Sequence, residues 1–216
     1  VGVNTDSMLV QPKMEIAGLD LVTGEQHYEE EVRGSRFKVA ASSFFQVNTG
    51  QLSRAVDEIR ELLDLGGDEV VVDAYCGVGV FAVLMSSYVK RVIGIEESAS
   101  AIEDANRNLN GTMNVEFIEG KTEHVMADWQ DEDSVDVLLL DPPRVGCHPD
   151  VLESVKKLQP KKVLMVSCEP AAMARDLDLL CDGGMYTLDT VRPVDMFPQT
   201  RHVETISVLS FQESQG

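Results

Sequence analysis

A cysteine follows a short apolar segment in the C-terminal half of the chain. Residues 163–166 read as a buried strand that leads into Ser167, Cys168, Glu169 and Pro170, and a helical pattern comes next. Ligands of open α/β sheets bind outside the carboxyl ends of the strands, so Cys168 is predicted to face the active-site crevice. A lone cysteine is also a common buried packing residue, and only the other motifs of the chain favour a nucleophile here.

A glycine-containing turn earlier in the chain has the pattern of a cofactor site. Residues 73–81 follow the apolar strand 70–72 and open a helix, and Gly77 and Gly79 permit a tight turn with close backbone approach to a ligand. Glu96 ends the next strand, where an acid can accept hydrogen bonds from both ribose hydroxyls. This pair fits a dinucleotide or S-adenosylmethionine. Because a third glycine is missing, the methyl donor is favoured, and a turn that serves packing alone is the alternative.

A second carboxylate is expected in the same crevice. Asp141, Pro142, Pro143 and Arg144 follow the predicted strand 135–140, and the two prolines restrict the shape of the loop. An ordinary proline turn is the simpler interpretation, but the position at a strand end favours a site. Enzymes that methylate exocyclic amines usually present an aromatic side chain after a related Asp-Pro-Pro element. Arg144 stands at that place, which argues against amino-group methylation.

The elements that must position these residues alternate along the chain. A helix is predicted over 49–63, and strands are predicted over 70–72, 91–95, 115–118, 135–140 and 163–166. Helices are predicted over 81–88, 99–109, 149–158 and 171–181, and each follows one of these strands except 115–118. Ser98 is a plausible cap of the helix 99–109. Two more strands are predicted near 185–192 and 202–209. The pattern predicts an α/β fold with a mostly parallel seven-stranded sheet, covered on both faces and closed by a C-terminal antiparallel hairpin. The acidic segment 128–136 is predicted to be a solvated loop.

Composition narrows the class of protein. The 216 residues have no apolar run near the roughly 18 residues that span a membrane. The four cysteines are far apart, so neither a disulfide framework nor a zinc site is expected, and a reducing cytoplasm is predicted. The net charge of -19 means that any contact with nucleic acid must be concentrated in a local groove or supplied by something outside this chain. Adaptation to high salt is the other explanation.

Together, the motifs resemble the RNA (uracil-5-)-methyltransferase family, whose members make 5-methyluridine in tRNA or rRNA. The resemblance covers nearly the whole chain from about residue 28 and rests on five segments in the family's order, 44–48, 73–81, 141–146, 167–170 and 195–204. It implies a Rossmann-like class I methyltransferase fold, S-adenosylmethionine as cofactor, no metal, and a uridine of rRNA or tRNA as target, with no DNA or membrane partner. Residues 1–43 are interpreted as a β-rich remnant of an upstream RNA-binding region, and 44–216 as the catalytic domain.

The resemblance also assigns the site. It implies that Cys168 is the nucleophile and Glu204 the base. The residues expected around S-adenosylmethionine, including the glycine of the turn, are Gln46, Tyr75, Gly77, Glu96 and Asp141. The sequence departs from the usual family pattern at Val80, Lys121 and Glu169. These departures concern the affinity for the cofactor more than the class of reaction.

The chemistry explains why a cysteine and a carboxylate are needed. Carbon 5 of uracil is a poor nucleophile, and a thiolate that adds to carbon 6 delivers negative charge to carbon 5. After methylation a base must remove the carbon-5 proton so that the thiolate can leave. The thiol needs a lowered pKa for efficient attack. The helix N-terminus near Pro170 is expected to contribute to this, and Glu169 to oppose it.

Three rival functions remain. An RNA cytosine-5 methyltransferase uses the same thiolate logic, but those enzymes commonly carry a cysteine in the fourth-strand motif, and Asp141–Arg144 has none. A non-catalytic RNA-binding or cofactor-binding module would be indicated by loss of Cys168 or Glu204, and both are present. A dehydrogenase is disfavoured by the glycine pattern.

Overall fold

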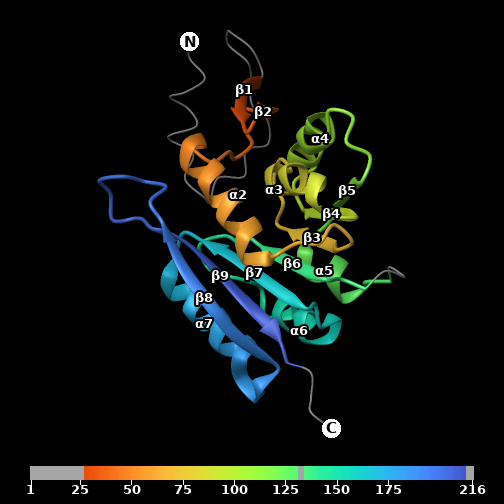
Figure 1. The fold of residues 1–216 in the computed structure, drawn as a ribbon. Helices are drawn as coiled ribbons and strands as arrows, with labels where there is room; N and C mark the ends of the chain where they lie inside the picture. The colour runs from red at the N-terminus through yellow and green to blue at the C-terminus, as the bar shows by residue number, and fades with distance from the viewer. Residues whose placement is uncertain (1–26, 131–133, 213–216) are drawn as a thin grey trace.

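The computed structural model describes residues 27–130 and 134–212. Its strands are β1 (His27–Val32), β2 (Ser35–Ala40), β3 (Val70–Ala74), β4 (Arg91–Glu96), β5 (Val115–Glu119), β6 (Val137–Leu140), β7 (Lys162–Ser167), β8 (Tyr186–Val194) and β9 (Glu204–Phe211). Its helices are α2 (Thr49–Leu63), α3 (Val80–Met85), α4 (Ala99–Asn108), α5 (Thr122–Ala127), α6 (Pro149–Leu158) and α7 (Pro170–Cys181), with short 3-10 turns η1 (Ser86–Tyr88) and η2 (Asp182–Gly184). Figure 1 shows their arrangement.

Seven strands form one twisted sheet in the order β5-β4-β3-β6-β7-β9-β8. The pairs from β5 to β7 are parallel, whereas β9 is antiparallel to both β7 and β8. The predicted mostly parallel seven-stranded sheet with a C-terminal antiparallel hairpin is therefore confirmed. The last strand lies inside the sheet, between β7 and β8, and so its first residue lies beside the end of β7 (Figure 1).

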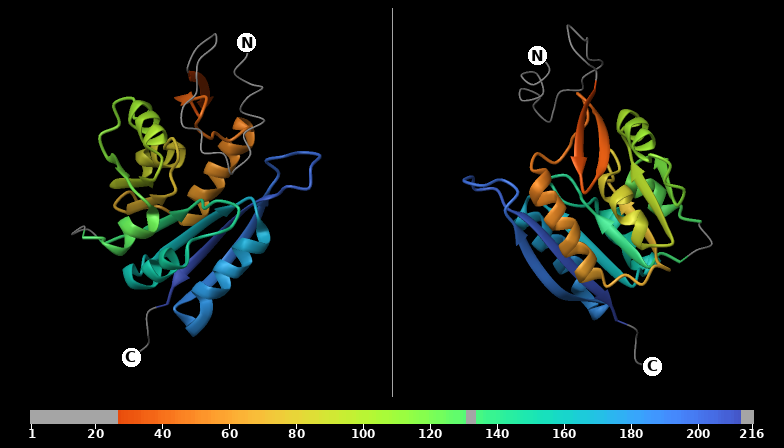
Figure 2. Two further views of the ribbon diagram at one scale, coloured as in Figure 1. Left: turned by 180° about the vertical axis from the view of Figure 1, so that it is seen from behind. Right: turned by 45° about the horizontal axis from the view of Figure 1, so that its top comes forward.

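Alternate residues of each strand face two separate cores. Val71, Leu139 and Leu164 pack with α2, α3 and α4 on one face of the sheet. Leu138 and Met165 face the other side, where α6 and α7 cover the sheet together with Met126 of α5. Figure 2 shows α2 and α7 on opposite faces. A parallel sheet covered on both faces leaves only its strand ends open to ligands, which directs attention to the carboxyl edge.

Local capping explains the helix boundaries. The side chain of Asn48 accepts a hydrogen bond from the Gln51 backbone N–H at the start of α2, and Asp64 ends the helix in the left-handed conformation. Ser98 caps α4 as predicted, by accepting from the Ala101 N–H. The helix α5 was not predicted, because six residues are too few to show a helical period.

The hairpin of β1 and β2 packs on the sheet domain rather than extending the sheet. Backbone N–H groups of β2 donate to α4 side chains, from Lys38 to Asn108 Oδ1 at 2.7 Å and from Ala40 to Asp104 Oδ2 at 2.8 Å. Of the segment 1–43 that the sequence set apart, residues 1–26 lie outside the described residues, and the boundary at residue 43 stays a prediction. In the part of the chain that the structure describes, every helix is too short or too polar to cross a membrane.

Candidate active site

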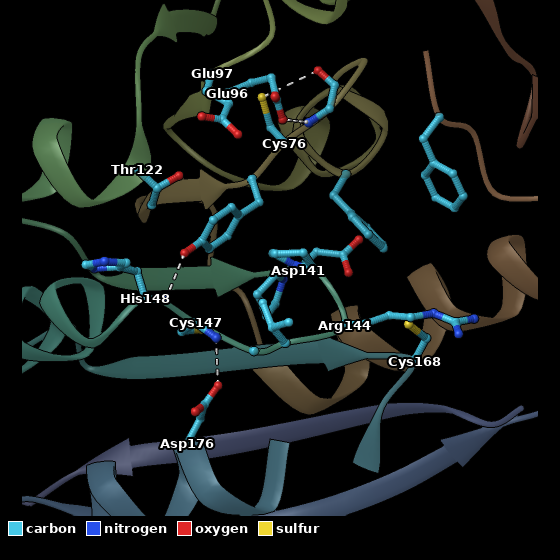
Figure 3. Close-up of a pocket in the computed structure, with 18 of the residues that line it drawn as sticks. Cys76, Glu96, Glu97, Thr122, Asp141, Arg144, Cys147, His148, Cys168 and Asp176 are labelled. Atoms are coloured by element: carbon cyan, nitrogen blue, oxygen red, sulfur yellow. Dashed lines mark hydrogen bonds between the residues drawn. The ribbon is translucent and has the colours of Figure 1, made fainter. Parts of the chain in front are cut away.

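A cavity of about 1180 Å³ opens at the carboxyl ends of β3, β4, β6 and β7. Figure 3 shows its lining, with Asp141, Arg144 and Cys168 on one side and Glu96 and Thr122 on the other. Every site residue predicted from the sequence lines this one cavity: Gln46, Tyr75, Gly77, Glu96, Asp141, Cys168 and Glu204. The fold thus brings together residues as far apart in the sequence as Gln46 and Glu204.

The turn between β3 and α3 forms one wall of the cavity. Tyr75, Gly77 and Gly79 all have positive φ angles, of 65°, 54° and 80°. Gly79 is required for space as well as for conformation, because a Cβ there would lie 2.6 Å from the ring of Phe117. The start of α3 is held from below by the buried Asp73, whose Oδ2 accepts from the Ala82 N–H at 3.0 Å.

Glu96 fixes the shape of this wall. Its Oε2 accepts from the Gly77 N–H at 3.1 Å, and its Oε1 accepts from the Ser98 N–H at 2.8 Å. Each carboxylate oxygen can accept more than one hydrogen bond, so capacity for a ligand hydroxyl remains. The residue is half-buried and lines the cavity, as expected for a group that receives a ribose.

Two buried oxygen atoms near the cavity have no hydrogen-bond partner among the described residues. They are Oε1 of Gln46, which lines the cavity, and Oδ1 of Asp73, behind the turn. Burial raises the pKa of Asp73 to about 7, although the bond from Ala82 lowers it and Glu96 adds a smaller upward effect. A buried acceptor without a partner costs free energy, so Oε1 of Gln46 is suited to accept a hydrogen bond from a ligand.

Asp141 follows β6 and faces the same cavity (Figure 3). Burial raises the pKa of its carboxyl well above the usual range, and the nearby carboxyls of Glu204 and Asp73 raise it further. The carboxyls of Glu204 and Asp73 thus form a cluster with Asp141 and disfavour its ionised form. Such a cluster is better suited to a cationic ligand than to an anionic one.

The nucleophile and the base predicted from the sequence come from neighbouring strands. Ser167, the last residue of β7, pairs with Thr205 of β9, and the next position along this antiparallel register joins Cys168 and Glu204. Glu204 is only 5% exposed, and burial raises its pKa to about 6. A carboxylate with that pKa is ionised at neutral pH and accepts a proton readily.

Arg144 is the main addition to the predicted site. It comes from the loop after β6, and its side chain lies beside that of Cys168 (Figure 3). Burial and Glu204 raise the pKa of the Cys168 thiol, and Arg144 lowers it. Arg144 therefore offsets part of the upward effect that burial and Glu204 have on the pKa of Cys168. The contribution expected from the helix N-terminus near Pro170 stays a prediction.

The profile of the family "tRNA (Uracil-5-)-methyltransferase" matches residues 20–212. An "Uncharacterized RNA methyltransferase" of Lactobacillus johnsonii is 42% identical over 196 residues, which cover 89% of this chain and 43% of that protein. A second such protein, from Oceanobacillus iheyensis, is 42% identical over 88% of this chain and 42% of its own length. The chain therefore spans less than half the length of these curated relatives.

Among solved structures, the tRNA (uracil-54, C5)-methyltransferase of Pyrococcus abyssi in complex with S-adenosyl-L-homocysteine matches with a TM-score of 0.74. The sequences are 29% identical, and the match covers 87% of this chain and 45% of that one. Trm5b of the same organism, at 17% identity and a TM-score of 0.68, shares the fold.

Proposed function

The chain belongs to the tRNA (uracil-5-)-methyltransferase family, and from this premise we propose that it transfers a methyl group from S-adenosylmethionine to carbon 5 of a uridine in RNA. The observation that carries the proposal is the meeting of Cys168, Glu204 and Arg144 at one end of a cavity that has the glycine turn and Glu96 at the other.

The cavity suits S-adenosylmethionine. The unpaired Oε1 of Gln46 offers an acceptor, Glu96 offers its carboxylate to the ribose, and Gly77 lets the backbone approach the ligand. Tyr75 and Asp141 complete the set of residues that would hold it. The acidic character of the cavity favours a ligand with a positive sulfonium and ammonium over a dinucleotide with its anionic pyrophosphate. When bound, this cofactor supplies an electrophilic methyl group.

Cys168 has the geometry to activate the uracil ring. Its thiolate would add to carbon 6, forming the sulfur–carbon bond and shifting the electron pair of the 5,6 double bond toward carbon 5 and the carbonyl oxygen at carbon 4. Arg144 would favour the thiolate before this attack, against burial and Glu204, which raise the pKa of the thiol. Carbon 5 would then use this electron pair to bond the methyl group, whose bond to the cofactor sulfur breaks and leaves its electrons on that sulfur.

Glu204 has the geometry to finish the reaction. Its carboxylate would take the proton from carbon 5; the electron pair of that carbon–hydrogen bond restores the double bond, and the sulfur–carbon bond breaks to release the thiolate. The strand β9 begins at Glu204, beside Thr205, the partner of Ser167, so the proposed base lies close to the proposed nucleophile. Burial supports the role, because it keeps the pKa of Glu204 raised, at about 6.

The charge of the chain fits RNA only if the contact is local. Several arginines bind acids away from the site, as Arg33 binds Asp57 and Arg107 binds Asp104. The lining of the cavity includes Lys121 and Arg144, whereas Arg175, which also lines it, binds Asp176. Phe44, which is 72% exposed and lines the mouth, offers an aromatic surface to an unstacked base. The target uridine must leave its stack to reach Cys168, so a loop or an opened stem of tRNA or rRNA is the proposed substrate.

The product distinguishes this function from its closest rival. The chain is incubated with S-adenosylmethionine and with unmodified tRNA or rRNA, and the RNA is digested to nucleosides for mass spectrometry. The proposal expects 5-methyluridine. Formation of 5-methylcytidine instead would assign the cytosine-5 reaction, and binding of NAD in place of S-adenosylmethionine in calorimetric titration would contradict the methyltransferase proposal.

A further inference from the structure

Two adjacent residues of α7 form hydrogen bonds with the loop that carries Arg144. Oδ2 of Asp176 accepts a hydrogen bond from the Cys147 N–H at 2.8 Å, and Nη2 of Arg175 donates to the Val145 carbonyl at 2.9 Å. The two side chains also bind each other, with Nε and Nη2 of Arg175 donating to Oδ1 of Asp176 at 2.8 and 2.6 Å. We call this pair the α7 clamp.

Gly146 lies at the centre of the clamp. It is flanked by the two gripped residues, has a φ of 88°, and its N–H donates to the Pro143 carbonyl at 2.8 Å. A Cβ at this position would lie 2.3 Å from Nη2 of Arg175 and 2.5 Å from Oδ2 of Asp176. The loop therefore approaches α7 as closely as a backbone can, and only glycine permits the contact.

Burial of the Asp176 carboxylate in the clamp has a cost in free energy. Asp176 is fully buried, with 0% exposure, and a buried carboxylate is tolerated only when charges and hydrogen bonds compensate it. Neither Arg175 nor Asp176 has a part in the proposed chemistry. Both, however, lie on the helix that begins at Pro170, two residues after Cys168 and about one and a half helical turns before the clamp. The helix thus begins close to Cys168 and contacts the Arg144 loop further along.

From this geometry we infer that Arg175 and Asp176 are positioning residues, which fix the loop of residues 141–148 so that the Arg144 side chain stays beside Cys168. The inference rests on the proposed function for the roles of Arg144 and Cys168. It extends that function to two residues that line the cavity but have no role in the proposed bond-making and bond-breaking steps. Their effect should pass entirely through Arg144.

The test is the pH dependence of Cys168 alkylation, measured in the whole chain without RNA or cofactor. Iodoacetamide labelling is quantified by mass spectrometry on the peptide that contains Cys168, because the thiolate is the form that reacts. Arg144→Gln removes the cation and is expected to move the midpoint to higher pH. Asp176→Asn leaves an acceptor for Cys147 but removes the charge that orders Arg175. It is expected to move the midpoint in the same direction, with labelling at pH 7.5 slower by roughly three- to tenfold.

A double variant decides whether the clamp acts through Arg144. Asp176→Asn in the Arg144→Gln background is expected to cause no further shift of the midpoint. Asp178→Asn is the matched control, because Asp178 lies on the exposed side of the same helix, and it should leave the midpoint unchanged. If Asp176→Asn fails to fold by circular dichroism, Arg175→Ala takes its place, since that side chain is 53% exposed.

The outcomes separate this inference from the proposed function. An unchanged midpoint in folded Asp176→Asn or Arg175→Ala, beside a shifted midpoint in Arg144→Gln, would overturn the clamp and leave the role of Arg144 intact. Shifts that add in the double variant would also overturn it, because the clamp would then act independently of Arg144. An unchanged midpoint in Arg144→Gln itself would contradict both the clamp and the proposed activation of Cys168.

Discussion

Cys168 and Glu204 are neighbours across the boundary between β7 and β9, although they lie far apart in the sequence. The pairing of Ser167 with Thr205 fixes them one step beyond the last shared position of the two strands. The antiparallel insertion of β9 between β7 and β8 is what creates this contact. A fold in which the last strand simply extended the edge of the sheet would separate Cys168 from Glu204.

Replacement of Cys168 by alanine should abolish methyl transfer and spare cofactor binding. The residue is the proposed nucleophile, so turnover should fall by at least about a thousandfold. The affinity for S-adenosylmethionine in calorimetric titration should stay within about twofold of the parent, because the cofactor residues lie on other strands. Transfer of tritiated methyl groups to RNA gives the rate.

The matched control for this variant is Cys181→Ala. Cys181 ends α7, is half-buried, and is absent from the lining of the active-site cavity. It should retain parental turnover. Normal turnover in Cys168→Ala would exclude covalent activation by this residue.

Glu96→Gln should weaken binding of S-adenosylmethionine by roughly tenfold to a hundredfold, the usual loss for a hydrogen bond to a charged group. Glu119→Gln is the control, since Glu119 pairs with Glu96 in the register of β4 and β5 but is exposed and outside the cavity. Calorimetric titration gives both affinities. Equal affinities in the two variants would contradict a ribose site at Glu96.

The rate of methyl transfer should fall as the pH falls through about 6. Glu204 must be ionised to accept the carbon-5 proton, and burial raises its pKa to about 6, so its protonated form predominates below that pH. The rate is expected to drop by about tenfold per pH unit there, because the basic form declines in that proportion. A rate at saturating substrate that stays constant from pH 5 to pH 8 would show that Glu204 is not the base.

Gly79→Ala should destabilise the fold more than Gly183→Ala. Both glycines have a φ near 80°, but a Cβ at Gly79 would overlap the ring of Phe117, whereas one at Gly183 has no neighbour within 4 Å among the described residues. The conformational strain of about 1 kcal/mol is common to both, and overpacking should add about 1–3 kcal/mol at Gly79 alone. Urea unfolding gives the two free energies. Equal losses would mean that the ring moves aside freely.

The fold could be predicted from local patterns in the sequence. The helices α2 and α6 begin and end at the predicted residues, because an apolar stripe and clear capping residues mark them. The strands were found as short apolar runs, with ends displaced by one or two residues. The helix α5 was not predicted, because a helix of six residues is too short to show a helical period in the sequence.

Site residues that belong to a local motif could be predicted from the sequence. Residues that reach the site only through tertiary packing could not. Glycine turns and strand-end acids are marked by their spacing, and so Gly77, Glu96 and Asp141 were found. Arg144 was noticed only as the replacement of an aromatic residue, because nothing local indicates that its side chain reaches another strand's cysteine. The hydrogen bond from the Cys147 N–H to Asp176 joins residues from different elements. A backbone N–H donor has no signature in the sequence, so this bond could not be predicted.

The most direct measurement is the fate of RNA on the Glu204→Gln variant. This side chain cannot take the carbon-5 proton, so the Cys168 sulfur should remain bonded to carbon 6 of the methylated ring. With RNA and S-adenosylmethionine, a protein–RNA adduct should survive a denaturing gel, and mass spectrometry should locate it on the Cys168 peptide. Glu153→Gln, an exposed change on α6, should turn over normally and give no lasting adduct. Absence of the adduct in a variant that binds both substrates, or full turnover by Glu204→Gln, would contradict the proposed pairing of Cys168 with Glu204.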